Sequence, residues 1–219
     1  QLEFHSIRDP LTGLHNRRSF LELMKLRVAN VKNDRREEDQ ISPDCLMIMD
    51  IDHFKHINDT WGHTTGDAVL IEVAQRLRHA VRDSDMSMRW GGEEFLVYSP
   101  KTKTMQLIPM VDRILKSIGS TPVKVGNYSI AVTVSAGFIS LPFSGVPEQV
   151  CNWEKAMQLA DMALYLGKIN GRNRAYGLLK LLAPYEELLP VLETDFAETI
   201  EKGLVEIVIV NGPAQASHS

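Results

Sequence analysis

Residues 89–95 read Arg-Trp-Gly-Gly-Glu-Glu-Phe, and the prediction of the fold starts from this stretch. Short apolar or β-branched runs flank it at residues 86–90 and 95–98, and a glycine pair suits a tight turn that needs positive φ. The stretch therefore predicts a β-hairpin. A turn without side chains lets a ligand approach closely, and the carboxylates beside it can hold a hard cation against that ligand. A charged, solvated hairpin is an equally good interpretation of the turn alone.

The composition is that of a soluble globular protein. The 219 residues are 44% hydrophobic and 24% charged, which is enough for one well-packed domain with some chain left over. No run reaches the apolar length of a membrane span, so we expect no membrane contact by this segment. A net charge of -4 disfavours a nucleic acid polymer as partner, whereas a small anionic substrate carried with a divalent cation fits. Cys45 and Cys151 lie in apolar settings and are predicted to be buried thiols.

No signal peptide is visible, and the sequence starts with Gln1 rather than Met. We interpret it as a segment of a longer protein, and we expect it to be the cytoplasmic output domain of a larger sensor.

Hydrophobic periodicity predicts an α+β fold with a central, mostly antiparallel sheet covered by helices. Pro109 argues against regular first turns in one of the helices. The expected helices are a segment from residue 17, a short passage after residue 52, a helix before residue 82, and residues 105–118 and 153–169; the expected strands are the hairpin and residues 45–49, 124–125, 128–141 and 175–178.

Two segments are predicted to lie outside this regular pattern. Residues 32–44 are strongly charged and are expected to form a solvated loop. Residues 179–219 contain interrupting prolines, a possible strand at 204–210 and a polar end at 211–219 that is expected to be disordered. We therefore divide the chain into a domain of residues 1–178 and a C-terminal extension, residues 179–219, of unknown role.

Acidic residues end the apolar run at residues 45–49. Asp50 and Asp52 alternate, so they share one face of an extended chain. Asp50 and Glu93 would converge if their two strands pair in the sheet, which is the arrangement that Mg²⁺ needs when it carries substrate phosphates. The competing interpretation is that these acids are solvated strand ends.

Four motifs, in this order along the chain, resemble those of the GGDEF family of bacterial diguanylate cyclases. The resemblance covers about residues 5–178 and implies a palm-like sheet, akin to ferredoxin-like and nucleotide cyclase-like folds, that condenses two GTP into cyclic di-GMP with release of pyrophosphate. The signature here has the GGEEF form, with Glu where the family name has Asp. The motifs are Asp-Pro-Leu-Thr-Gly-Leu-His-Asn-Arg-Arg at 9–18, Asp-Ile-Asp-His-Phe-Lys-His-Ile-Asn-Asp at 50–59 with Gly62-His63 and Gly66-Asp67, the stretch at 89–95, and Ala-Leu-Tyr-Leu-Gly-Lys at 163–168 with Gly-Arg-Asn at 171–173.

The resemblance implies a metal site and a reacting acid. Asp50, the backbone carbonyl of Ile51 and Glu93 would hold Mg²⁺ or Mn²⁺. Glu94 matches a family acid that takes part in metal binding or in activating the ribose 3′-hydroxyl. The general base is not assigned.

The resemblance also implies a GTP site. Asn58 and Asp67 would bind guanine, and a carboxylate can accept both N1–H and N2–H of that base, which disfavours an adenine-using or mixed cyclase. Without the family, Asp67 is an acid favoured in a first helical turn, and the cations would be surface charges. The remaining contacts carried over are Lys168 and Arg172 to the terminal phosphates with Lys55 and Arg89 assisting, Phe54 through its backbone N–H, and Gly91 and Gly92 against the nucleotide.

Arg82 and Asp85 match the Arg-x-x-Asp product-inhibition site of the family, five residues before Gly91. The resemblance implies that cyclic di-GMP, the product, is also an inhibitor bound there. The competing interpretation is an ion pair at the end of a helix.

Each domain of the family binds one GTP, so the reaction needs a second copy of the domain in a transient homodimer. Two other classes of function stay open. One is a catalytically silent domain that acts as a receptor for cyclic di-GMP or GTP, and the other is an interaction domain whose acidic hairpin is mere surface.

Overall fold

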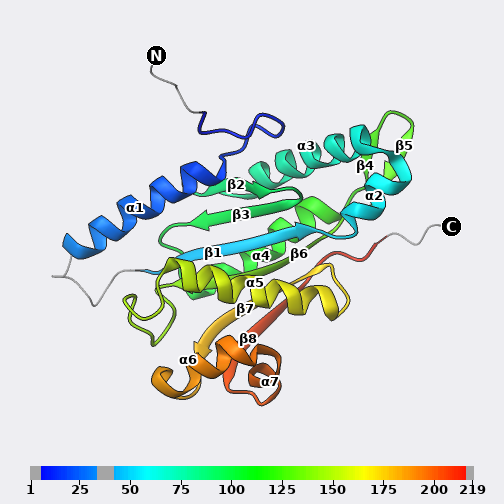
Figure 1. Cartoon of the computed structure of the whole chain (residues 1–219). Helices are drawn as coiled ribbons and strands as arrows, with labels where there is room; N and C mark the ends of the chain where they lie inside the picture. The colour runs from blue at the N-terminus through cyan, green and yellow to red at the C-terminus, as the bar shows by residue number, and fades with distance from the viewer. Residues whose placement is uncertain (1–5, 34–41, 216–219) are drawn as a thin grey trace.

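The computed structural model describes residues 6–33 and 42–215, and a six-stranded sheet with the order β2-β3-β1-β6-β7-β8 forms its centre (Figure 1). β6 and β7 pair in parallel and the other neighbours pair antiparallel, so the predicted α+β fold with a mostly antiparallel sheet is confirmed. The elements are α1 (Arg17–Asn33), β1 (Asp44–Ile51), α2 (Phe54–Trp61), α3 (His63–Ala80), β2 (Met86–Gly91), β3 (Glu94–Ser99), α4 (Thr104–Gly119), β4 (Val123–Val125), β5 (Tyr128–Ile130), β6 (Val134–Leu141), α5 (Trp153–Ile169), β7 (Arg174–Leu181), α6 (Tyr185–Thr194), α7 (Phe196–Glu201) and β8 (Val205–Asn211).

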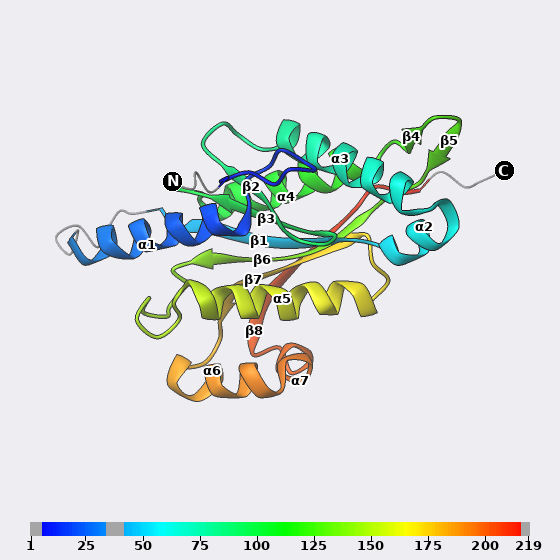
Figure 2. The same cartoon turned by 45° about the horizontal axis from the view of Figure 1, so that its top comes forward.

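Helices cover both faces of the sheet, with α2, α3 and α4 on one side and α1, α5, α6 and α7 on the other (Figure 2). β1 lies between these layers because its apolar residues face both of them. Cys45, Met47 and Met49 pack toward α3 and α4, and Leu46 and Ile48 pack toward α1 and α5. The continuous apolar run of this strand is the pattern expected of a strand buried on both faces.

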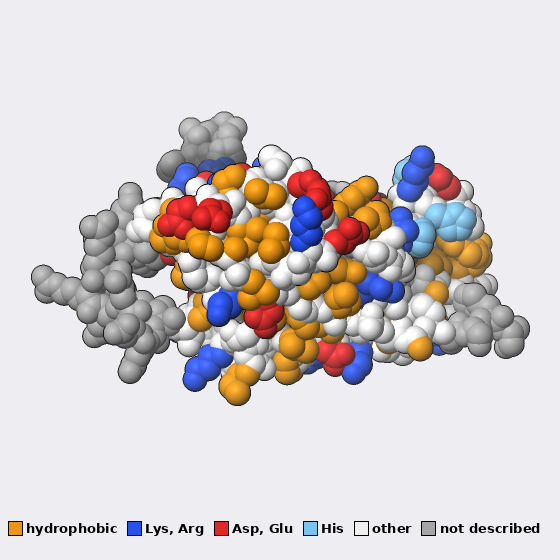
Figure 3. Space-filling view, turned by 90° about the horizontal axis from the view of Figure 1, so that it is seen from below, with side chains coloured by type: hydrophobic (Ala, Val, Ile, Leu, Met, Phe, Trp, Pro, Cys, Tyr) orange, Lys and Arg blue, Asp and Glu red, His pale blue; other side chains and the backbone are white. Residues whose placement is uncertain are grey.

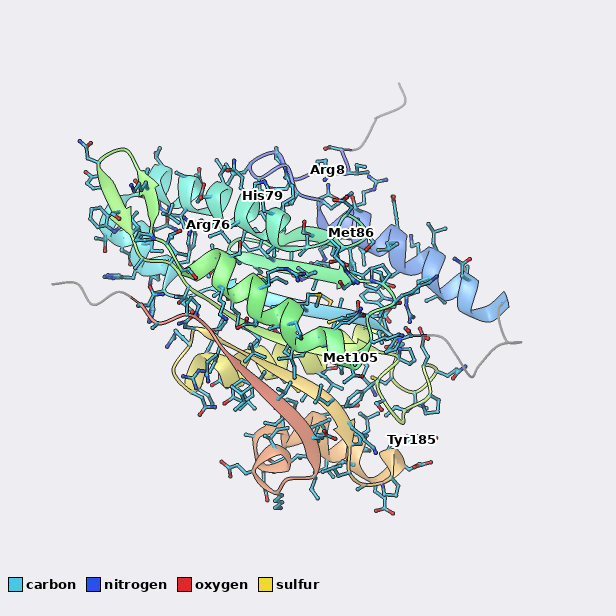
Figure 4. The ribbon with its side chains drawn as sticks, turned by 180° about the vertical axis from the view of Figure 1, so that it is seen from behind. Arg8, Arg76, His79, Met86, Met105 and Tyr185 are labelled. Atoms are coloured by element: carbon cyan, nitrogen blue, oxygen red, sulfur yellow. The ribbon has the colours of Figure 1, made fainter. Side chains whose placement is uncertain are left out.

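Arg76 ties α3 to the end of α4, and Figure 4 shows it between these two helices from behind. Its guanidinium donates hydrogen bonds to the carbonyls of Ile118 at 2.8 Å, Thr121 at 2.6 Å and Pro122 at 3.0 Å. The last carbonyls of a helix have no partners within the helix, so Arg76 satisfies one of them at Ile118 and holds the segment that follows α4 through the other two carbonyls.

The predicted hairpin is present. β2 and β3 pair antiparallel, with a register shift between Arg89 and Gly91, and Gly92 adopts a φ of 44° in the turn. Left-handed φ is strained for residues with a Cβ, which explains a glycine at this position.

The prediction of a single strand over residues 128–141 is wrong. β5 pairs with β4 in a separate two-stranded sheet, and β6 enters the central sheet only at Val134. Between them, Thr133 accepts a hydrogen bond from the N–H of Asp52 at 2.9 Å and donates its hydroxyl to the Asp52 carboxylate at 2.7 Å. These contacts hold the chain at the end of β1 and interrupt the strand.

Two other expectations are only partly met. α1 extends to Asn33 and β1 begins at Asp44, so the loop expected at 32–44 is shorter at both ends, and residues 34–41 lie outside the described ranges. α4 accommodates Pro109 within its first half. The missing N–H there would have met a carbonyl of the first turn. The 16 residues of the helix are held by an apolar buried face that includes Leu107, Met110 and Val111.

The segment after residue 178 joins the same sheet. Residue 178 lies inside β7, and β8 pairs with β7 from Arg174↔Asn211 to Leu181↔Val205, so the expected strand at 204–210 is present. The helices α6 and α7 were not predicted, since Pro184 and Pro190 interrupt the pattern; Pro184 stands just before α6 and Pro190 lies within it. Of the tail expected to be disordered, Asn211 ends β8, and residues 216–219 lie outside the described ranges.

Within residues 6–33 and 42–215, none of the helices combines the length and apolarity that a membrane crossing requires. Cys45 and Cys151 are buried free thiols, as predicted.

Candidate active site

The candidate site lies where β1 ends beside the glycine turn. Asp50 is opposite Glu94 of β3 in the antiparallel register, and the N–H of Ile51 donates to the Glu93 carbonyl at 3.3 Å. Lys168, near the end of α5, forms an ion pair with the Asp50 carboxylate. Three segments that are far apart in the sequence therefore bring Asp50, Glu93, Glu94 and Lys168 together where β1 ends and β3 begins.

The carboxylates at this place are held in an electrostatically unfavourable setting. Burial raises the pKa of Asp50, Lys168 partly opposes this effect, and Glu93 and Asp52 add to it. Burial also raises the pKa of Glu94, and the neighbouring Asp50 and Asp161 raise it further. Acids with raised pKa values that gather in one place are typical of functional sites, and here the charge of Lys168 compensates them only in part.

Asp52 differs from Asp50, although both belong to the same motif. Its carboxylate accepts hydrogen bonds from the hydroxyls of Thr133 at 2.7 Å and Ser135 at 2.6 Å and from the N–H of Asn173 at 2.9 Å. These donors make Asp52 an internal anchor. The extended chain that carries Asp50 ends at Ile51, so Asp52 stands just beyond β1.

The turn beside these acids is open. Gly91 and Gly92 are exposed, and a Cβ on either would meet no atom within 4 Å. Arg89 donates to the Gly92 carbonyl at 2.9 Å and lies 3.3 Å from an oxygen of Asp9. Burial alone would raise the pKa of Asp9, but hydrogen bonds from Thr12 and the charge of Arg89 lower it overall. In this structure Arg89 therefore braces the turn.

Asn58 and Asp67 come from adjacent helices, α2 and α3. Gly66 lets them approach, since a Cβ on it would lie 1.8 Å from Oδ1 of Asn58 and 3.3 Å from the ring of Phe54. Oδ1 of Asn58 is buried and has no hydrogen-bond partner among the described residues, and Asp67 is exposed. Buried polar atoms are normally paired, so this amide has the capacity to bind a ligand.

The remaining phosphate-binding candidates are placed around the same end of the molecule. Lys55 is exposed on α2, and Arg172 follows α5 in a turn with a φ of 61°. Neither side chain forms an ion pair with another residue that the structure describes. Both are therefore available to an anionic ligand.

The oxygen donors at the end of β1 suit a hard divalent cation. In the described part of the chain, His, Cys, Asp and Glu side chains do not gather in threes around a point that could hold a metal. Mg²⁺ needs fewer, because it uses one or two carboxylates and takes water and substrate phosphates as its other ligands. Asp50, Glu93 and the carbonyl of Ile51 fit that requirement.

The exposed histidines His53, His56 and His63 lie at the end of the molecule that carries α2, where Figure 3 shows histidine side chains together.

Arg82 and Asp85 are joined at the other end of the sheet. The Arg82 guanidinium lies 3.1 Å from Asp85, and it donates to the hydroxyls of Ser99 at 3.2 Å and Thr102 at 2.9 Å. The Asp85 side chain is 0% exposed, whereas that of Arg82 is 40% exposed. Arg82 is therefore accessible to a ligand, and Asp85 is committed to internal partners.

Sequence reasoning missed three residues near the site. Asp161 on α5 adds to the charge around Glu94, Asp9 holds Arg89, and Asn173 binds Asp52. Asp9 and Asn173 lie inside the quoted motifs, but spacing gives no information about their partners 80 and 121 residues away.

Comparison with known proteins agrees with this geometry. The family model described as "Diguanylate cyclase, GGDEF domain" matches residues 6–174. Diguanylate cyclase DosC of Escherichia coli K12 is 36% identical over 167 residues, which cover 76% of this chain and 34% of that protein. Diguanylate cyclase DgcP of Pseudomonas aeruginosa is 37% identical over 170 residues, which cover 77% of this chain and 23% of that protein. The chain thus spans about a third or less of these two relatives.

Among solved structures, the GGDEF domain of DgcB from Caulobacter crescentus, determined in complex with c-di-GMP, is similar with a TM-score of 0.68 and 31% identity. The similarity covers 81% of this chain and 98% of that one. The chain belongs to the GGDEF family of diguanylate cyclase domains.

Proposed function

We propose that this domain is a diguanylate cyclase, which condenses two GTP into cyclic di-GMP and releases pyrophosphate. The observation that carries the proposal is the meeting of Asp50, Glu94 and Lys168 beside the open glycine turn. A soluble fold gains nothing from this arrangement, because burial and mutual repulsion raise the pKa values of its carboxyl groups. Binding of a cation with a nucleotide would relieve both effects.

In the proposed reaction, the 3′-hydroxyl oxygen of one GTP attacks the α-phosphorus of the other. A P–O bond forms, the bond to the β-phosphate oxygen breaks, pyrophosphate leaves, and the hydroxyl proton passes to a base that is not assigned. The same transfer in the other direction closes the ring.

The residues of this chain would share the work of binding and orientation. Asn58 and Asp67 bind guanine, which places the ribose and phosphates along the turn formed by Gly91 and Gly92. Lys168 balances the charge of Asp50 in this structure, and an incoming phosphate offers it a second anion. The other proposed contacts are Lys55, Arg89, Arg172 and the backbone of Phe54.

Asp50, Glu93 and the Ile51 carbonyl would hold Mg²⁺ or Mn²⁺, which when bound offsets the negative charge that develops on the phosphates. Glu94, the first residue of β3, would orient the attacking 3′-hydroxyl.

The proposal includes a second copy of the domain, because one domain presents one guanine site and the product contains two guanines. It also includes regulation by the product. Arg82 would bind cyclic di-GMP through the part of its guanidinium that stays exposed, while Asp85 holds the guanidinium in place. A cytoplasmic position within a larger sensor protein is part of the same proposal.

Incubation with GTP and Mg²⁺ at high protein concentration tests this function, with chromatographic detection of the product. The parent should form cyclic di-GMP, and Glu93→Gln should form none. If neither forms product, titration with GTP and with cyclic di-GMP separates the alternatives: binding of both without turnover indicates a receptor, and binding of neither contradicts a nucleotide site.

A further inference from the structure

The C-terminal residues 205–215 contact the turn that carries Arg172, and we call these residues the C-terminal brace. The family match ends at residue 174, so the brace lies beyond the part of the chain that the family explains. β8 runs from α7 along β7 toward the turn after α5, as the view from behind shows (Figure 4). Its last pair, Arg174↔Asn211, puts the next residues of the brace against that turn.

Two reciprocal hydrogen bonds join the brace to Asn173. The N–H of Gly212 donates to the Asn173 carbonyl at 2.8 Å, and the Asn173 side-chain amide donates to the Pro213 carbonyl at 2.8 Å. The approach is close, because a Cβ on Gly212 would lie 1.9 Å from Oδ1 of Asn173 and 2.9 Å from its carbonyl oxygen. Only glycine permits this contact without movement of the turn.

Asn173 is also held by the residue that follows β1, Asp52. Its N–H donates to Asp52 at 2.9 Å, and the hydroxyls of Thr133 and Ser135 fix that carboxylate. Asn173 is therefore hydrogen-bonded both to the brace and to the residue that follows β1.

The turn needs such support because its backbone is strained. Arg172 has a φ of 61° and Asn173 a φ of 47°, a region that residues with side chains rarely adopt. Backbone in this region persists only when its surroundings determine it, and strain of this kind is concentrated at functional sites.

The far end of the brace is anchored to α4. Pro213 packs against Gly119, where a Cβ would lie 3.1 Å from the proline ring, and the Gln215 amide donates to the Gly119 carbonyl at 3.1 Å. The turn is thus connected to a helix on the opposite face of the sheet from α5.

We propose that the C-terminal brace positions Arg172 for the terminal phosphates of GTP, with Gly212 and Asn173 as the positioning residues. The inference rests on the proposed function, since it takes Arg172 as a phosphate contact. It assigns a role to a segment that the sequence left without one.

Binding of GTP and of GMP, each with Mg²⁺, by the full chain tests the brace. Arg172 would meet only the terminal phosphates, so Gly212→Ala should weaken GTP binding about tenfold and leave GMP binding unchanged. Gln215→Ala is the matched control. It removes a contact to α4 and leaves the Asn173 contacts in place, so both affinities should stay near the parent values.

A double-mutant cycle separates positioning from general support. If Gly212 acts through Arg172, then Gly212→Ala should cause no further loss of GTP affinity in an Arg172→Ala background. Additive losses, or equal losses for GTP and GMP, would overturn the inference. Thermal unfolding of each variant checks that it is folded.

If Gly212→Ala does not fold, a chain ending at Asn211 replaces it, compared with one ending at Gln215. Both keep the whole of β8, and only the shorter one lacks the two partners of Asn173. A parent that binds GTP no better than GMP would instead refute the phosphate contacts, and with them the proposed function. If the parent binds GTP more tightly than GMP and the Gly212→Ala or shortened chain keeps the same preference, the role of the brace is refuted and the proposed function is not.

Discussion

Carboxylates that lie around the two ends of β3 have opposite surroundings. At the Ser99 end, Asp85 is paired with Arg82 and accepts the Ser99 hydroxyl, and nearby Asp44 binds Arg27 at 2.8 Å and the N–H of Lys101 at 2.9 Å. At the Glu94 end, burial and neighbouring acids raise the pKa values of the carboxyl groups, and Lys168 is the cation in contact.

The surrounding hydrogen-bond donors distinguish structural acids from candidate functional ones in this fold. A buried acid that stabilises the fold is surrounded by donors, because an unpaired buried charge is costly. An acid that lacks such donors disfavours the fold when it is ionised, which indicates that its partner is a ligand. Substitutions at the two ends should therefore affect different properties.

The largest effect is expected for Asp50→Asn. Under the proposed function, turnover of GTP should fall about a thousandfold or more, since a proposed ligand of the metal ion is lost and such ions contribute several kcal/mol to transition-state stabilisation. The unfolding midpoint should not fall, because burial and the charges of Glu93 and Asp52 together disfavour the Asp50 carboxylate more than its pairing with Lys168 favours it. Initial rates and thermal unfolding measure the two quantities, and a variant that unfolds early while keeping its activity would reverse the comparison.

Arg82→Ala should instead destabilise the fold, by about 2 kcal/mol, because it leaves the buried Asp85 without its cation. It should also relieve inhibition by cyclic di-GMP. Urea unfolding and product titration measure these effects. Lys116→Ala is the matched control, since its pair with Asp112 is exposed and should contribute less than about 0.5 kcal/mol. Equal stability losses in both variants would argue against a special role for the buried pair.

The pH dependence of kcat/KM sharpens the contrast, because this quantity reports the pKa values of the free enzyme. Asp50 and Glu94 must be ionised to serve a cation and a nucleotide, and both pKa values are raised by burial. Activity should therefore decline on the acid side at a pH above the ordinary range of Asp and Glu, by about tenfold per pH unit below one of the two pKa values and about a hundredfold below both. A decline confined to the ordinary carboxyl range would show that the site is less strained than the structure indicates.

The smallest effect is expected for Glu94→Gln, a slight gain in stability. The raised pKa means that the folded chain binds the proton of Glu94 more tightly than the unfolded chain does, so stability falls as pH rises through the folded-state pKa. At neutral pH the substitution should stabilise the fold by about 0.5 kcal/mol, a small figure because the side chain is partly exposed. The gain should vanish in acid. Chemical unfolding at the two pH values measures it, and a loss of stability at neutral pH would contradict the prediction.

Local sequence was enough to predict most of the central elements and the family, and it supplied a set of candidate site residues. The apolar run before Asp50, the glycine pair at 91–92 and the helical periodicity around Val69 and Val73 depend on neighbours a few residues away, and all three features have the predicted structure. The ordered motifs also identified the family, because their residue types are kept together by one shared site.

Tertiary structure alone decided which of these residues meet. The contact of Lys168 with Asp50 joins residues 118 positions apart, and the contacts of Asp52 with Ser135 and Asn173 make it an internal anchor. β8 likewise became the sixth strand because the edge of β7 was free to pair with it. Such choices depend on packing and hydrogen bonding between distant segments, and local periodicity carries no information about them.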